Sequence, residues 1–174
     1  MLGAVVQELG GWWSGVLHPF DSNHLVLMLI VGVLAGIATT QGREPWVGPF
    51  AYLVGTFVGI VAAAAGLDLP FLDGAIIAGL VIGVVLMFTP PPRMSAVLPL
   101  AAILGGALHG LSYRHDDTSG ASTEPVRYVL GFVFTTVLLQ AFGAITGSSI
   151  GRSVIARRTV AVCAAAATVV VLAV

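Results

Sequence analysis

The chain has 174 residues, of which 57% are hydrophobic and only 9% are charged, and its mean hydropathy is +1.02. Ordinary soluble domains carry about 25% charged residues, so this composition excludes a soluble globular protein and indicates an integral membrane protein. The formal net charge of −1 provides no basic surface for nucleic acid. The lone cysteine, Cys163, cannot form an internal disulfide and lies within an apolar run.

The first segment in chain order, residues 1–17, is moderately apolar and contains Glu8. It lacks the basic start of a signal peptide, and it is short for a membrane span. We expect an interfacial or partly inserted helix that ends where His18 and Pro19 interrupt the backbone. Trp12 and Trp13 are typical of the membrane interface.

About six apolar runs follow, each close to the roughly 20 residues that a membrane helix needs. The connections between them are rich in Gly, Pro and charged residues, as expected of turns. The sequence therefore predicts an all-α integral membrane protein, a compact bundle of about six transmembrane helices forming one domain over residues 1–174. The expected helices cover approximately 25–40, 46–67, 71–89, 94–113, 127–150 and 159–174.

Five of these runs contain two glycines four residues apart, a spacing that lets neighbouring helix backbones approach closely. The pairs are Gly32/Gly36, Gly55/Gly59, Gly79/Gly83, Gly106/Gly110 and Gly143/Gly147. We expect close helix crossings within the bundle. The same glycine faces would also suit a homo-oligomer or docking in a larger membrane complex, and the sequence leaves these alternatives open.

The arginines indicate an orientation. Five of the seven follow the first, third and fifth apolar runs, and two lie on the other side. The positive-inside rule makes the side with five arginines cytoplasmic, so both termini face outward. Seven of the eight acidic residues then fall on the outer side, where they would raise the local concentration of cations.

Polar side chains are rare within the apolar runs, and this topology brings them together in the outer half of the bundle. Ionisable residues inside a membrane are costly and usually face the bundle interior. His24 and Met28 share one helix face, and His18 and Asn23 precede them. The others are Asp73 at the start of the third run, His109 and Tyr113 at the end of the fourth, and Gln140 about 13 residues into the fifth, roughly 20 Å deep.

Imidazole binds nickel, copper and zinc, and a thioether favours softer ions. The pattern therefore predicts a metal site formed by His18, His24, Met28, Asp73 and His109, with Asn23, Tyr113 and Gln140 as a secondary polar lining. Ordinary structural roles are the alternative. A histidine near a helix end can contact headgroups or cap a carbonyl, and Asp73 can cap its helix.

Four segments occur in order along nearly the whole chain: LHPFDSNHLVLMLIVGVLAG, AGLDLPFLDGAIIAGLVIG, ALHGLSYRHD and RYVLGFVFTTVLLQAFG. They resemble the motifs HPxxGxDHxxxMxxVG, LxLPxxExxIAxSxxxxG, FHGxAHGxE and YxLGFxxATxLLHxxG of the HupE/UreJ family, the small membrane proteins of hydrogenase and urease gene clusters. The resemblance implies a multi-pass protein of a bacterial inner membrane that moves nickel or a related ion by facilitated diffusion.

The resemblance assigns residues only where the motifs match, namely at His18, His24, Met28 and His109. Asp73 stands where the family has Glu. Asn23, Tyr113 and Gln140 stand where the family has Asp, His and His, and the interval between the first two histidines is one residue shorter. These three replacements remove strong ligands or charge, because amides bind nickel weakly and tyrosine must first lose a proton with a pKa of about 10.

Two functions follow from these observations. The first is a permease for a transition-metal cation, nickel before others, which is passive or ion-coupled because the sequence has no P-loop. The second is a structural or accessory subunit of a larger membrane complex that keeps the fold without strong metal ligands. A haem- or pigment-binding subunit using His24 or His109 is a third, without a paired histidine pattern to support it. We predict no enzymatic activity and no tightly bound cofactor, because no nucleophile is placed beside a base.

Overall fold

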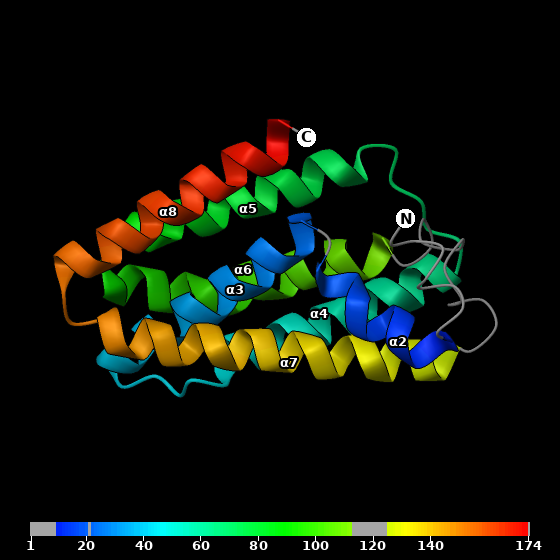
Figure 1. Cartoon of the computed structure of the whole chain (residues 1–174), viewed down its shortest axis with the longest axis horizontal. Helices are drawn as coiled ribbons and strands as arrows, with labels where there is room; N and C mark the ends of the chain where they lie inside the picture. The colour runs from blue at the N-terminus through cyan, green and yellow to red at the C-terminus, as the bar shows by residue number, and fades with distance from the viewer. Residues whose placement is uncertain (1–9, 21, 113–124, 174) are drawn as a thin grey trace.

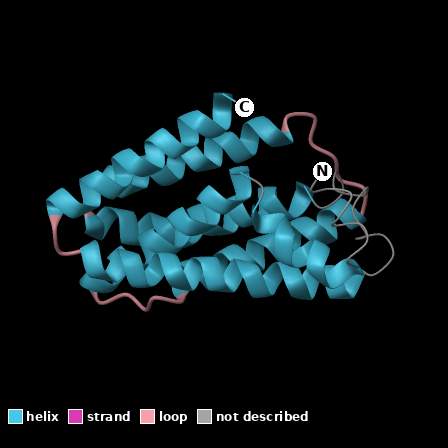
Figure 2. Ribbon diagram, viewed as in Figure 1, coloured by secondary structure: helices cyan, strands magenta, loops and turns pink. Residues whose placement is uncertain are grey.

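The computed structural model describes residues 10–20, 22–112 and 125–173, and these residues form seven α-helices and no strand (Figures 1 and 2). The helices are α2 (Gly10–Leu17), α3 (Ser22–Ala38), α4 (Val47–Ala64), α5 (Leu72–Phe88), α6 (Pro91–Leu111), α7 (Pro125–Ile150) and α8 (Val154–Ala173). Short 3₁₀ turns at His18–Phe20 and Thr39–Gln41 precede and follow α3. The all-α bundle with a short N-terminal helix, predicted from the sequence, is confirmed.

Four of the helical segments are long and apolar enough to cross a membrane: His24–Gln41, Val47–Ala64, Pro91–Leu111 and Pro125–Ile150. Helix α5 is as apolar but has 17 residues. Helix α8 has 20 residues and carries Arg157 and Arg158 near its start. Large apolar side chains such as Phe57 and Phe142 are each 65% exposed, an exposure that suits lipid and not water.

Two pairs of parallel helices form the centre of the bundle, and glycines hold each pair together. Helix α3 packs along α7 (Figure 1). A Cβ added at Gly32 or Gly36 would clash with the backbone of Gln140 or Ala144, respectively. The contact positions advance together along both chains, so α3 and α7 run in the same direction.

Helices α4 and α6 repeat this arrangement. A Cβ at Gly106 or Gly110 would clash with the backbone of Tyr52 or Thr56, so these two helices are also parallel and in backbone contact. The Gly55/Gly59 and Gly143/Gly147 pairs contribute from the opposite partners. Four of the five predicted glycine pairs therefore lie at close crossings within the chain.

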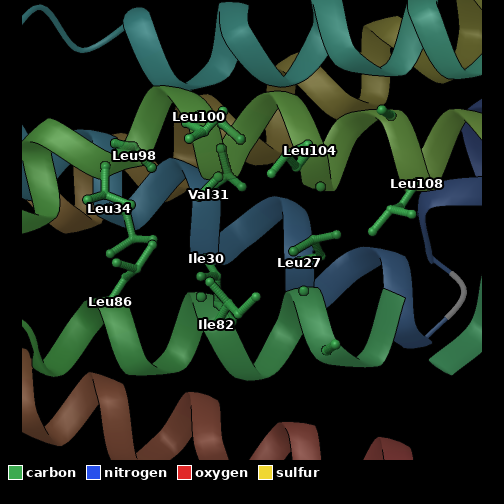
Figure 3. A pocket seen from close by; sticks show the side chains of 18 of the residues that line it. Leu27, Ile30, Val31, Leu34, Ile82, Leu86, Leu98, Leu100, Leu104 and Leu108 are labelled. Atoms are coloured by element: carbon green, nitrogen blue, oxygen red, sulfur yellow. The ribbon is translucent and has the colours of Figure 1, made fainter. Parts of the chain in front are cut away.

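The fifth glycine pair lies in a more open region. A Cβ added at Gly79 would meet no atom within 4 Å, and one at Gly83 would meet only the side chain of Ile30. Helix α5 pairs with α8 on one side of the bundle (Figure 1). Between α3, α5 and α6 it leaves a cavity of about 510 Å³ lined by apolar side chains, into which Leu27, Val31 and Leu104 point (Figure 3).

The short helix α2 packs on the first half of α7 and sets the position of the turn that follows. A Cβ at Gly15 would clash with the backbone of Tyr128, and Gly131 faces the backbone of Trp12 in the same way. The Thr135 hydroxyl donates a hydrogen bond to the Val16 carbonyl at 3.0 Å. This docking holds the chain at residue 18 against the bundle.

Candidate metal centre

Three histidines from different elements meet at one end of the bundle. The ligand nitrogens of His18, His24 and His109 all lie within 4.8 Å of one another. His18 begins the 3₁₀ turn after α2, His24 lies in the first turn of α3, and His109 lies in the last turn of α6. His24 and His109 are separated by 85 positions in the sequence, yet their ring centroids lie only 4.1 Å apart. The structure thus brings these three of the predicted residues together.

Local sequence explains how the first two histidines come together. His18 is followed by Pro19, which is buried and fixes the backbone of the turn between α2 and α3. The chain then re-enters a helix, which brings His24 Nδ1 to 3.0 Å from His18 Nε2. One nitrogen of this pair donates a hydrogen bond and the other accepts it. A metal ion bound by both rings would replace that hydrogen bond.

The third histidine is oriented by a residue on another helix. Tyr52, which is 0% exposed in the second turn of α4, places its hydroxyl 2.9 Å from His109 Nδ1. His109 Nε2 is buried and has no hydrogen-bond partner. When Nδ1–H donates to the Tyr52 oxygen, Nε2 presents a free lone pair, which is the tautomer that binds a metal.

The surroundings of the three rings are apolar and favour a neutral imidazole at His18. Phe132 of α7 packs with ring centroids 5.6 Å from His18 and 5.1 Å from His109. Burial, and secondarily the neighbouring His24, lowers the pKa of His18 from 6.5 to about 3. Neutral imidazole is the form that coordinates a transition metal, so His18 can bind without losing a proton first.

Polar and sulfur-containing side chains continue inward from the histidines. Met28 lies one turn after His24 and is 0% exposed. On α7, Phe132, Thr136 and Gln140 follow at intervals of four, so they share one helix face, and both amide atoms of Gln140 are buried without a partner. Gln140 packs beside Gly32, which places it about 12 Å further along α3 than His24.

The other predicted site residues lie elsewhere or outside the described chain. Asp73 is exposed in the first turn of α5 and does not join the three histidines. It is not the N-cap of α5 either, because Phe71 occupies that position and makes no side-chain cap bond. Asn23 lies in α3, but its side chain is not described, and Tyr113 lies outside the described residues.

Tyr52 and Phe132 are the residues of the site that the sequence did not single out. A tyrosine in the interior of an apolar span is the signal that could have identified Tyr52, because its hydroxyl must find a partner inside the membrane. Phe132 has no such signal, since a phenylalanine is ordinary in a membrane helix. Only the packing of α7 against the turn at His18 places it under the rings.

Comparisons with known proteins agree with the resemblance in the sequence. The family model described as HupE / UreJ protein matches residues 4–173. The chain is similar to Protein HupE of Rhizobium leguminosarum bv. viciae, with 28% identity over 138 residues that cover 76% of this chain and 68% of that protein. No solved structure matches.

Proposed function

Because the chain belongs to the HupE/UreJ family, which is associated with accessory roles for hydrogenase and urease, we propose that it is a membrane permease for a transition-metal cation, with nickel as the first candidate. The observation that carries the proposal is the meeting of His18, His24 and His109 at one end of the helical bundle. Three imidazoles on three separate elements suit a borderline metal ion such as nickel, copper or zinc, and they do not suit magnesium or calcium.

The ligand chemistry favours a conduit over a storage site. Among the described His, Cys, Asp and Glu side chains, the cluster contains only histidines, so none of these described residues brings a carboxylate to a bound dication there. Such a site binds less tightly than one with an acidic ligand. Permeation requires binding that is strong enough to draw an ion in and weak enough to release it.

A buried polar path supports movement inward from the cluster. Met28 and Thr136 are both 0% exposed one turn below the histidines, and Gln140 follows one turn later on α7. Further along α6, Ser95 has a buried hydroxyl without a partner and lines a cavity of about 120 Å³ that also includes Glu44. The route that we propose runs from the histidines past Gln140 to this second cavity.

Nickel uptake into cells or proteoliposomes tests the proposal. His24→Ala and His109→Ala should each lower the initial uptake rate at least tenfold, because each removes one of three ligands. Met87→Ala is the matched control: Met87 is 2% exposed in the hydrophobic core and lies outside the cluster. It should keep wild-type uptake per folded molecule. Unchanged uptake in both histidine variants would rule out the permease.

A further inference from the structure

An apolar cavity lies apart from the histidine cluster. It holds about 510 Å³ between α3, α5 and α6 and is lined entirely by Leu, Ile, Val, Ala and Gly (Figure 3). Water at about 30 Å³ per molecule would fill it with roughly 17 molecules, and none of them would find a side-chain hydrogen-bond partner in the lining. The lining therefore favours an apolar occupant over water.

The cavity opens toward the bilayer. Four of the side chains at its rim are strongly exposed although they are aliphatic: Ile82 at 52%, Val97 at 47%, Leu100 at 62% and Leu104 at 57%. In a protein that spans a membrane, such side chains face hydrocarbon. The cavity is thus continuous with the lipid phase.

The dimensions of the cavity fit one lipid chain. Its lining on α6 runs from Val97 to Leu108, which is about 17 Å at ~1.5 Å per residue. Half of a bilayer hydrocarbon core is about 15 Å thick. The cavity is therefore about as long as one leaflet is thick, and on α6 it begins about 9 Å from the start of the helix at Pro91.

A cation lies one helical turn before the first residue of α6 that lines this cavity. Arg93 lies four residues before Val97 in α6, and Leu100 and Leu104 continue at intervals of three and four, so all four share one helix face. Arg93 is exposed and forms no ion pair with another residue in the described part of the chain. Its guanidinium can reach the headgroup region and bind a phosphate with two hydrogen bonds.

We propose that α3, α5 and α6 form a binding site for one phospholipid, with the phosphate on Arg93 and one acyl chain in the cavity. The small residues of α5 make the room: Gly79 faces open space where other glycine pairs of this chain hold backbones together. In the predicted topology, Arg93 faces the cytoplasm, so the lipid comes from the inner leaflet. The proposal is independent of the metal permease.

Native mass spectrometry of the full chain, delipidated and then titrated with phosphatidylglycerol or phosphatidylcholine, tests the site. Wild type should retain one phosphatidylglycerol and bind it about fivefold better than phosphatidylcholine, because one basic residue contacts the extra anionic charge. Arg93→Gln should lose that preference and keep weak binding of both lipids. Arg152→Gln is the charge control, since Arg152 is exposed in the turn between α7 and α8.

Gly79→Leu tests the cavity itself. It should abolish retention of the lipid, because the new side chain fills the space without a clash. Gly74→Leu is its matched control: Gly74 lies on the same helix, also has no atom within 4 Å of an added Cβ, and does not line the cavity. Undiminished retention in Gly79→Leu would overturn the proposal. The proposal would also be overturned if the wild-type chain formed a dimer that Gly79→Leu disrupts while the lipid is retained. The cavity would then receive a second copy of the chain.

Discussion

Replacing Tyr52 by Phe tests whether His109 is a ligand held in place from another helix. The substitution keeps the ring and removes the hydroxyl that lies 2.9 Å from His109 Nδ1. Tyr52 is 0% exposed, so no water takes over that hydrogen bond, and losing a buried partner costs about 1–3 kcal/mol. Loss of such an outer-shell partner typically weakens metal binding about 10–100-fold. We expect a nickel affinity lower by about that factor, and uptake at limiting nickel lower in proportion.

Isothermal titration of the purified protein with nickel chloride measures this effect directly. Thr168→Val is the control, because it also removes a buried hydroxyl, the one that donates to the Ala164 carbonyl in α8, far along the chain from the histidines. Both variants should lose some thermal stability, and only Tyr52→Phe should lose affinity. Equal nickel affinities for wild type and Tyr52→Phe would refute the role that we assign to the Tyr52–His109 hydrogen bond.

Three further predictions concern stability and transport. Gln140→Leu removes two buried polar atoms without partners, so the melting temperature should stay equal or rise while nickel uptake falls; a fall in stability would contradict this reasoning. Gly106→Ala should destabilise the bundle by about 1–3 kcal/mol in chemical unfolding, because its Cβ would clash with an α4 carbonyl, whereas Gly74→Ala should be neutral or stabilising. His18 stays neutral in the folded state to a pH of about 3 but takes up a proton near 6.5 when unfolded. Stability should therefore fall as pH drops through this window, with His18 contributing up to about 1.4 kcal/mol per pH unit, and His18→Phe should make that dependence shallower in thermal unfolding at pH 4–8.

The membrane fold could be predicted because its signals are local. Apolar runs, glycine spacing and the break at His18 and Pro19 each depend on a few neighbouring residues. The close crossings of α3 with α7 and of α4 with α6 follow from glycines that are visible in the sequence. The same spacing misleads at Gly79 and Gly83, since the sequence does not reveal whether a small face meets another backbone or an open cavity.

The site could be predicted only in part, for a different reason. His18, His24 and His109 are rare polar residues at helix ends, and an alternating topology places such ends together. Asp73 satisfies the same argument, yet it lies exposed on α5. The depth of a residue in the membrane follows from its position along the helix. The direction in which its side chain points around the helix axis depends on packing. Helix α5 contacts α3, α6 and α8, yet Asp73 at its start is directed away from the histidines, which a single sequence does not reveal.

The pattern of hydrogen bonding inside the bundle supports a transport role for Gln140. Four buried threonines each donate to a backbone carbonyl: Thr56, Thr135, Thr136 and Thr168. The backbone carbonyls of a helix thus readily accept a hydrogen bond from a short side chain. A leucine at position 140 would need no hydrogen-bond partner. Leaving both amide atoms of Gln140 unpaired costs about 1–3 kcal/mol for each group. A cation that has left the histidines and shed part of its water shell would be coordinated by the amide oxygen of Gln140. The amide without a hydrogen-bond partner is therefore consistent with a passing ion and is difficult to explain by stability alone.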